Sequence, residues 1–206
     1  MTVLIETQYL PSIEFFCAVS EAAEIQIEVC EHFVKQSYRN HTFIKAANRI
    51  EKLTVPLTSK GNRVVIHDVK VDDSLNWRNN HWRTIESAYR KSPYYEHYVD
   101  DLHKIIFSDK IFLIDLNHAL LNTCLRWLRW EKKISFTESY HKNSPYSDVR
   151  NTLLSKKSFT DRNYYRPMNY TQVFGKQFVP NLSLLDLIFC KGPQAVEIIR
   201  ASSLNL

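Results

Sequence analysis

The chain has 206 residues, of which 44% are hydrophobic and 24% are charged, and its formal net charge is +5. A chain of this length and composition can bury one sizeable core, so we expect a single folded domain over residues 1–206. Polar and charged side chains interrupt the longest apolar stretch, residues 111–130, which argues against a membrane span of about 20 apolar residues. The N-terminus lacks the basic start and apolar run of a secretory signal, which predicts a cytoplasmic protein.

The N-terminal part predicts a strand, a helix and a second strand. Residues 2–6 and 24–29 are rich in β-branched side chains, and they flank an apolar-periodic stretch at 12–21 in which Ser12 is placed as the helix N-cap. A crossover this short predicts that the two strands are parallel neighbours. The loop at residues 7–11 then lies at the carboxyl end of the first strand, where such folds usually bind ligands.

The rest of the chain predicts further strands followed by a helical layer. Residues 41–46, 51–57 and 63–71 have strand patterns. Helical spacing of apolar residues predicts helices at 80–91, 94–107, 112–130, 182–189 and 194–201. We therefore expect an α/β fold of one domain, with a mixed sheet, a parallel N-terminal unit and a C-terminal helical layer.

Residues 141–168 form a polar, basic and weakly periodic segment. Six basic side chains and two acidic ones give it a charge of +4, most of the excess of the whole chain. A stretch of this length without clear elements is usually functional or disordered, so we interpret it as a basic lid or specificity loop. Its charge raises the local concentration of anionic partners.

The common signatures of nucleotide-binding and hydrolytic sites are missing. The chain has three glycines, which leaves no glycine-rich phosphate loop, and it contains no serine-hydrolase elbow. Its histidines lack the spacing of metal ligands and its four cysteines are far apart, so we predict neither a metal site nor a disulfide scaffold. No particular cofactor is indicated.

Two polar loops follow the first two predicted strands and are candidates for substrate binding. Gln8 and Tyr9 stand in the first loop, where their polar groups could meet a substrate or simply pack under the helix. The second loop contains several groups that could hold a phosphate or carboxylate, with a solvated connection as the alternative. Its candidate residues are Lys35, Gln36, Arg39 and Asn40.

A third candidate lies at the start of the helix predicted near residue 80. His81 stands in its first turn, where the positive end of the helix dipole favours a neutral imidazole suited to general-base catalysis. Arg83 follows as a further candidate for substrate binding. The alternative is that His81 is a hydrogen-bonded packing residue between tryptophans.

Four blocks of the sequence resemble the WbqC-like family of bacterial proteins. They are QYLPSIEFF at 8–16, KQSYRN at 35–40, NWRNNHWRTIESAYRKSPYY at 76–95 and QVFGKQFVPNLSLLDLIFCKG at 172–192. The chain departs from the family pattern at His41, where a second Arg is more usual. This weakens the hypothesis that two arginines together bind an anionic group of the substrate. The resemblance favours a functional role for all three candidate loops.

The resemblance implies a cytoplasmic enzyme of bacterial surface-polysaccharide (O-antigen type) biosynthesis. The expected reaction is transfer of an acyl or aminoacyl group to a nucleotide-linked amino sugar. His81 would act as the base while Lys35, Arg39 and the basic segment hold the diphosphate. The alternatives are a non-catalytic nucleotide-sugar or glycan binding protein and, less favoured, a nucleic-acid binding protein, because no recognition motif accompanies the basic residues. The sequence does not predict an oligomeric state.

Overall fold

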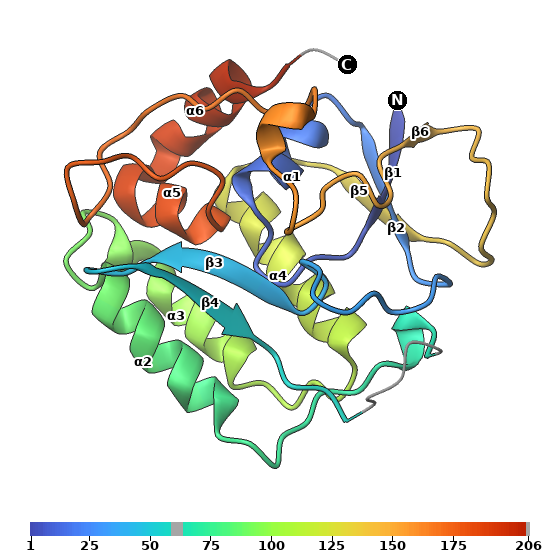
Figure 1. The fold of residues 1–206 in the computed structure, drawn as a ribbon, viewed down its shortest axis with the longest axis horizontal. Helices are drawn as coiled ribbons and strands as arrows, with labels where there is room; N and C mark the ends of the chain where they lie inside the picture. The colour runs from blue at the N-terminus through green and yellow to red at the C-terminus, as the bar shows by residue number, and fades with distance from the viewer. Residues whose placement is uncertain (59–63, 205–206) are drawn as a thin grey trace.

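The computed structural model describes residues 1–58 and 64–204. A four-stranded sheet contains β1 (Thr2–Glu6), β2 (Glu24–Glu28), β5 (Lys133–Phe136) and β6 (Ser147–Asp148), in the order β5-β2-β1-β6 (Figure 1). Each neighbouring pair is parallel, which confirms the predicted parallel N-terminal unit. The α/β class is confirmed as well.

The two faces of this sheet differ in polarity. Val3, Ile5, Ile25 and Ile27 are buried in the core, as expected for β-branched residues at every second position. The intervening positions place Leu4 opposite Gln26 and Glu6 opposite Glu28. The second face therefore carries carboxylates at the ends of both central strands.

Helix α1 (Ile13–Ala18) connects β1 and β2, and the Ser12 hydroxyl accepts a hydrogen bond from the Phe15 backbone N–H. This confirms Ser12 as the predicted N-cap. The strands β3 (His41–Lys45) and β4 (Ile50–Thr54) pair antiparallel and form a separate two-stranded sheet. The parallel and antiparallel strands thus belong to two sheets.

The predicted strand at 63–71 is wrong over its described part, residues 64–71. A short 3₁₀ turn, η1 (Ile66–Asp68), occupies this segment. Ile66 and Val69 are buried whereas His67 and Asp68 are exposed, which is a spacing of three rather than two. The alternating valines and isoleucine suggested a strand, but tertiary packing selected a turn. Residue 63 lies outside the described residues.

The second half forms the predicted helical layer. Its helices are α2 (Trp77–Tyr89), α3 (Tyr95–Ile106), α4 (Leu113–Trp127), α5 (Leu184–Lys191) and α6 (Ala195–Ser202). Helices α2, α3 and α4 pack side by side, the β3-β4 sheet lies over them, and α5 contacts α6 (Figure 1). Gly192, in the short η3 turn (Gly192–Gln194), ends α5 with a φ of 53°. Among the described residues, no helix is both long and apolar enough to cross a membrane.

The basic segment at 141–168 packs against the body of the protein in several places. It contributes β6 to the parallel sheet and a 3₁₀ turn, η2 (Phe159–Asp161). Val149, Leu153 and Tyr165 are buried, and Arg162 forms an ion pair with the buried Glu14. Part of its positive charge therefore neutralises buried carboxylates. Its function as a lid stays a prediction.

Candidate functional site

Tyr9 and His81, two of the predicted site residues, meet in the protein interior. The Tyr9 hydroxyl lies 3.0 Å from His81 Nδ1, and His81 Nε2 lies 3.2 Å from the Thr54 carbonyl oxygen. Because a carbonyl only accepts, Nε2 carries the proton and Tyr9 donates to Nδ1. Burial lowers the pKa of His81 to about 4, so the ring is neutral.

Both nitrogens of His81 are therefore engaged, and the residue is only 5% exposed. The imidazole joins three elements: the loop after β1, the end of β4 and helix α2. These contacts match the packing interpretation of His81. Its assignment as the catalytic base stays a prediction that an activity assay must test.

Arg39 is also buried, with 1% exposure. Its Nε and Nη2 donate to the two carboxylate oxygens of Glu31 at 2.7 and 2.8 Å, and Nη2 also donates to Asn151 Oδ1 at 3.1 Å. A bidentate pair of this kind fixes the guanidinium plane. Arg39 thus holds together the loop after β2 and the segment after β6.

The remaining predicted binding residues differ in how far they are exposed. Lys35 and Gln36 are exposed on the loop after β2, and Arg83 is exposed on α2. The half-buried Asn40 donates from Nδ2 to the Val55 carbonyl oxygen at 2.9 Å.

Gln8 is buried, and its Oε1 accepts from the Ser12 backbone N–H at 3.3 Å. Its Nε2 has no hydrogen-bond partner among the described residues. Tyr9 connects the first loop to two other segments. Its backbone N–H donates to the Tyr38 carbonyl oxygen in the second loop at 2.8 Å, and its hydroxyl contacts His81 on α2. This meeting point is a buried core.

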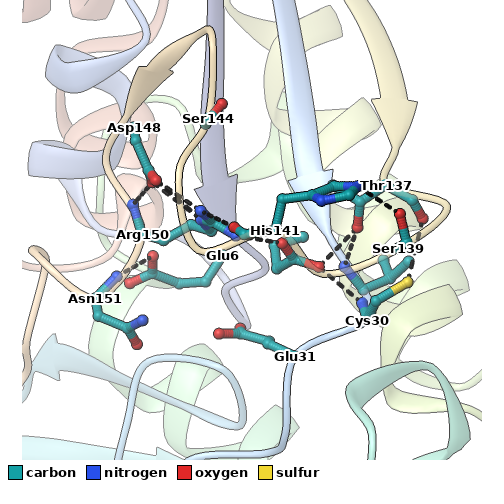
Figure 2. A network of polar contacts seen from close by, with 12 residues as sticks. Glu6, Cys30, Glu31, Thr137, Ser139, His141, Ser144, Asp148, Arg150 and Asn151 are labelled. Atoms are coloured by element: carbon teal, nitrogen blue, oxygen red, sulfur yellow. Dashed lines mark hydrogen bonds and ion pairs between the residues drawn. The ribbon is translucent and has the colours of Figure 1, made fainter.

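A different group of charged side chains gathers at the carboxyl ends of β1 and β2 (Figure 2). We call it the carboxyl-edge cluster, and it consists of Glu6, Glu28, Glu31, Arg39 and Arg150, of which Figure 2 labels Glu6, Glu31 and Arg150. All five residues are at most 9% exposed. Three carboxylates and two guanidinium groups are rarely buried together unless they are paired.

Glu28 is the best-connected carboxylate of the cluster. Its Oε1 accepts hydrogen bonds from Cys30 N at 2.9 Å and from Thr137 Oγ1 at 2.7 Å. Its Oε2 accepts from Arg150 Nη1 at 2.7 Å. Arg150 also donates to Asp148 and so joins β2 to β6.

Glu6 is a carboxyl group with a raised pKa. Burial raises its pKa to about 7, while Arg39 opposes the shift. Burial likewise raises the pKa of Glu31, again opposed by Arg39. Glu6 Oε2 accepts from the Asn151 backbone N–H at 3.0 Å. A carboxyl group that exchanges its proton near neutral pH is a feature of many functional sites.

A cavity of about 540 Å³ lies beside the cluster, between the polar face of the sheet and the connection from β5 to β6. Its size suits a small ligand. It is lined by Leu4, Gln26, Glu28, Phe136, Thr137, Glu138, Ser139, His141, Asn143, Ser144, Pro145, Tyr146 and Arg150.

The cavity wall combines aromatic and titratable groups. Phe136 and Tyr146 are 40% and 45% exposed, so their rings are accessible to a ligand. His141 Nε2 lies 2.8 Å from Ser139 Oγ, and both residues are exposed (Figure 2). Arg150 Nη2 donates to the His141 carbonyl at 2.7 Å and so holds this turn against the sheet.

Sequence reasoning missed Glu6, Glu28, Arg150 and His141 as site residues. Glu6 and Glu28 could have been found, because Glu6 ends the predicted strand at 2–6 and Glu28 is the next-to-last residue of the predicted strand at 24–29. Nothing local marks Arg150, which reaches Glu28 across 122 positions of the chain. Among residues 1–58 and 64–204, no group of three or more His, Cys, Asp or Glu side chains is arranged to hold a metal ion.

Comparison with known proteins places the chain in a family. The model of the WbqC-like protein family matches residues 7–168 and 153–198, so the chain belongs to this family. The chain is also 22% identical to the uncharacterized protein Rv1507c of Mycobacterium tuberculosis, over 224 residues that cover 96% of each protein. No solved structure matches the chain.

Proposed function

We propose that the protein is an acyl or aminoacyl transferase of bacterial surface-polysaccharide (O-antigen type) biosynthesis that acts on a nucleotide-linked amino sugar. We place its active site in the cavity beside the carboxyl-edge cluster. The observation that carries this proposal is the wall of that cavity, where Glu28, His141 and Arg150 stand beside accessible aromatic rings at the carboxyl edge of a parallel sheet.

The cavity suits an amino sugar in two respects. The rings of Phe136 and Tyr146 offer apolar faces against which a sugar ring can pack. The exposed carboxylate of Glu138 supplies negative charge that attracts the amino group. The nucleotide part would extend from the open side of the cavity.

His141 is the group we assign as general base. The amine attacks the carbonyl carbon of an activated acyl or aminoacyl donor, a C–N bond forms, and the bond to the leaving group breaks. His141 Nε2 takes the proton that the amine loses and returns it to the leaving group. In the absence of substrate, the Ser139 hydroxyl holds this nitrogen at 2.8 Å. The paired Arg150 and Glu28 keep the turn in place.

The test is an assay of transfer to nucleotide-linked amino sugars, using acyl thioesters and aminoacyl esters as donors. We expect His141→Ala to slow turnover by about 10²–10⁴-fold while leaving sugar binding nearly unchanged. His97→Ala, which removes an exposed histidine on α3, is the matched control and should keep full activity.

His81→Ala, examined in the same assay, separates the two candidate bases. If His81→Ala abolishes turnover in a folded protein while His141→Ala does not, the active site lies at the Tyr9–His81 contact and our placement is wrong. Loss of activity only in proportion to loss of folded protein would instead support the packing role of His81.

The alternative is a non-catalytic nucleotide-sugar or glycan binding protein. Exposed aromatic side chains near the cavity favour it: Phe136, Tyr146 and Tyr140, whose ring lies 4.9 Å from the Arg150 guanidinium carbon. Under this alternative, Tyr146→Ala weakens ligand binding, and no donor yields a transfer product. If the protein binds the nucleotide sugar but produces no transfer product with any of the donors, the binding-protein alternative is supported.

A further inference from the structure

A second buried polar cluster lies on the opposite side of the molecule from the carboxyl-edge cluster. Asp186 on α5 is fully buried, and its carboxylate accepts hydrogen bonds from the hydroxyls of Tyr89 and Tyr170 at 3.0 and 2.7 Å. Gln172 Nε2 donates to the same carboxylate at 2.8 Å. These bonds fix the segment at 169–178 against α2 and α5.

Lys45, the last residue of β3, places an ammonium group beside this network. The residue is 8% exposed, and its Nζ donates to Gln172 Oε1 at 3.1 Å and to the Gln177 carbonyl at 2.6 Å. An ammonium group has three N–H donors. One donor of Lys45 therefore has no hydrogen-bond partner among the described residues.

Lys45 lines a cavity of about 580 Å³ whose other lining residues come from the segment at 169–178. Gly175 forms part of the wall with a φ of 75°, a conformation that other residues rarely adopt. A Cβ atom built at this position would lie 3.5 Å from Lys45 Nζ. This distance is an ordinary van der Waals contact, so glycine is favoured here by the backbone conformation and not by a lack of space.

Of the smaller cavities that continue from this one, two extend its positive surface, while a third, which shares Asn169, Tyr170 and Thr171 with it, also contains Glu197. The first of the two shares Thr171 and Gln172 with the Lys45 cavity, and the second shares Lys91 and Phe174 with the first. The linings of the Lys45 cavity and of these two together contain six basic side chains and one acidic one, Glu86. The basic ones are Lys45, Arg83, Arg90, Lys91, Lys176 and Lys191.

Four of these cations are exposed: Arg83, Arg90, Lys91 and Lys176. None of the six forms an ion pair with a carboxylate among the described residues, whereas both arginines of the carboxyl-edge cluster do. The Lys45 cavity shares no lining residue with the cavity of the proposed active site. In Figure 1 the segment at 169–178 lies at the left and the connection between β5 and β6 lies at the right.

We propose that the Lys45 cavity is a second ligand site, which binds the phosphate groups of a small phosphorylated molecule. The free N–H of Lys45 and the Lys176 ammonium contact the phosphate oxygens, and Thr171 and Asn169 supply further hydrogen-bond donors from the cavity wall. Arg83, Arg90 and Lys91 attract the anion along the adjoining cavities. This site is independent of the proposed transferase reaction.

Isothermal titration calorimetry of the full chain tests the site with three probes: inorganic pyrophosphate, a nucleoside diphosphate and the matching nucleoside. We expect both phosphorylated probes to bind and the nucleoside not to bind. Tighter binding of the nucleoside diphosphate than of pyrophosphate identifies a nucleotide as the ligand. Equal affinity identifies the phosphate groups alone as the recognised part.

Four variants locate the binding. We expect Lys45→Met to weaken pyrophosphate binding at least tenfold. Lys176→Glu changes an exposed residue and should weaken the binding severalfold. Lys110→Glu, an exposed lysine outside the three cavities, and Glu28→Gln, in the proposed active site, should bind like the parent chain. The proposal is overturned if pyrophosphate does not bind, if Lys176→Glu binds normally, or if Lys110→Glu weakens binding as much as Lys176→Glu. Altered pyrophosphate binding in Glu28→Gln alone, in which Arg150 loses a carboxylate partner, would move the phosphate site to the carboxyl-edge cluster.

Discussion

Replacement of Glu6 by Gln tests the unusual protonation of the carboxyl-edge cluster. Glutamine has nearly the same shape, and its side-chain oxygen can still accept the hydrogen bond from the Asn151 backbone N–H. It cannot ionise. The variant therefore removes the titration of Glu6 and preserves most of its contacts.

The sign of the effect follows from the shift of the Glu6 pKa, which burial raises from 4.5 to about 7. The folded protein binds this proton more tightly than the unfolded chain, so the stability that Glu6 contributes falls as the pH rises. The contribution is fully present below about pH 4.5 and is lost by about pH 7. At about 1.4 kcal/mol per pKa unit, the change is about 3 kcal/mol of unfolding free energy.

The assay is urea unfolding of the parent chain and of Glu6→Gln at several pH values between 4 and 8.5. The difference in unfolding free energy between the two proteins reports the titration of Glu6 together with its coupling to Glu31, because contributions from groups that do not interact with Glu6 cancel. His41 and His81 are two examples. Burial lowers the pKa of each to about 4, so both histidines make the protein less stable as the pH falls below 6.5. This loss is the same in both proteins. Glu131→Gln removes an exposed carboxylate and controls for the change in net charge.

We expect the stability of Glu6→Gln relative to the parent chain to rise by about 3 kcal/mol between pH 4.5 and pH 8. A difference that stays constant across this range would refute the reasoning, because it would mean that Glu6 has the same proton affinity in the folded and unfolded chains. A difference of the opposite sign would mean that Arg39 dominates over burial at this carboxyl group.

Three further predictions concern the Arg39–Glu31 pair, Gly192 and the segment at 141–168. Arg39→Ala leaves the Glu31 carboxylate buried and unpaired, so we expect a loss of about 3–5 kcal/mol in urea unfolding and a smaller loss when Glu31→Ala is added. Gly192→Ala places a Cβ atom 2.5 Å from the Tyr94 ring at a φ of 53°, so its thermal midpoint should fall clearly, and an unchanged midpoint would contradict this backbone conformation. If residues 141–168 are a lid, limited proteolysis cuts there first and ligand slows the cut; uniform resistance along the chain would count against a lid.

Much of the fold was predictable because it depends on local patterns. The β-branched runs around residues 2–6 and 24–29, with a short capped helix between them, predict a parallel pair whatever the rest of the chain does. Apolar residues at helical spacing predicted α2, α3 and α4 in the same way. The segment at 64–71 shows the limit, because its alternation suits either a strand or a turn and only packing selects one.

The candidate site could be predicted only in part. Sequence placed Arg39 in a loop at the carboxyl end of a parallel strand, and the structure places it there, in contact with Glu31. Sequence by itself determined which types of residue lie near the carboxyl edge of the parallel sheet. Local periodicity predicts where each strand ends, and the loop residues follow directly after it. The tertiary structure alone decided that Arg150 meets Glu28 and that His81 is enclosed by Tyr9 and Thr54, because burial and pairing depend on segments that are far apart along the chain.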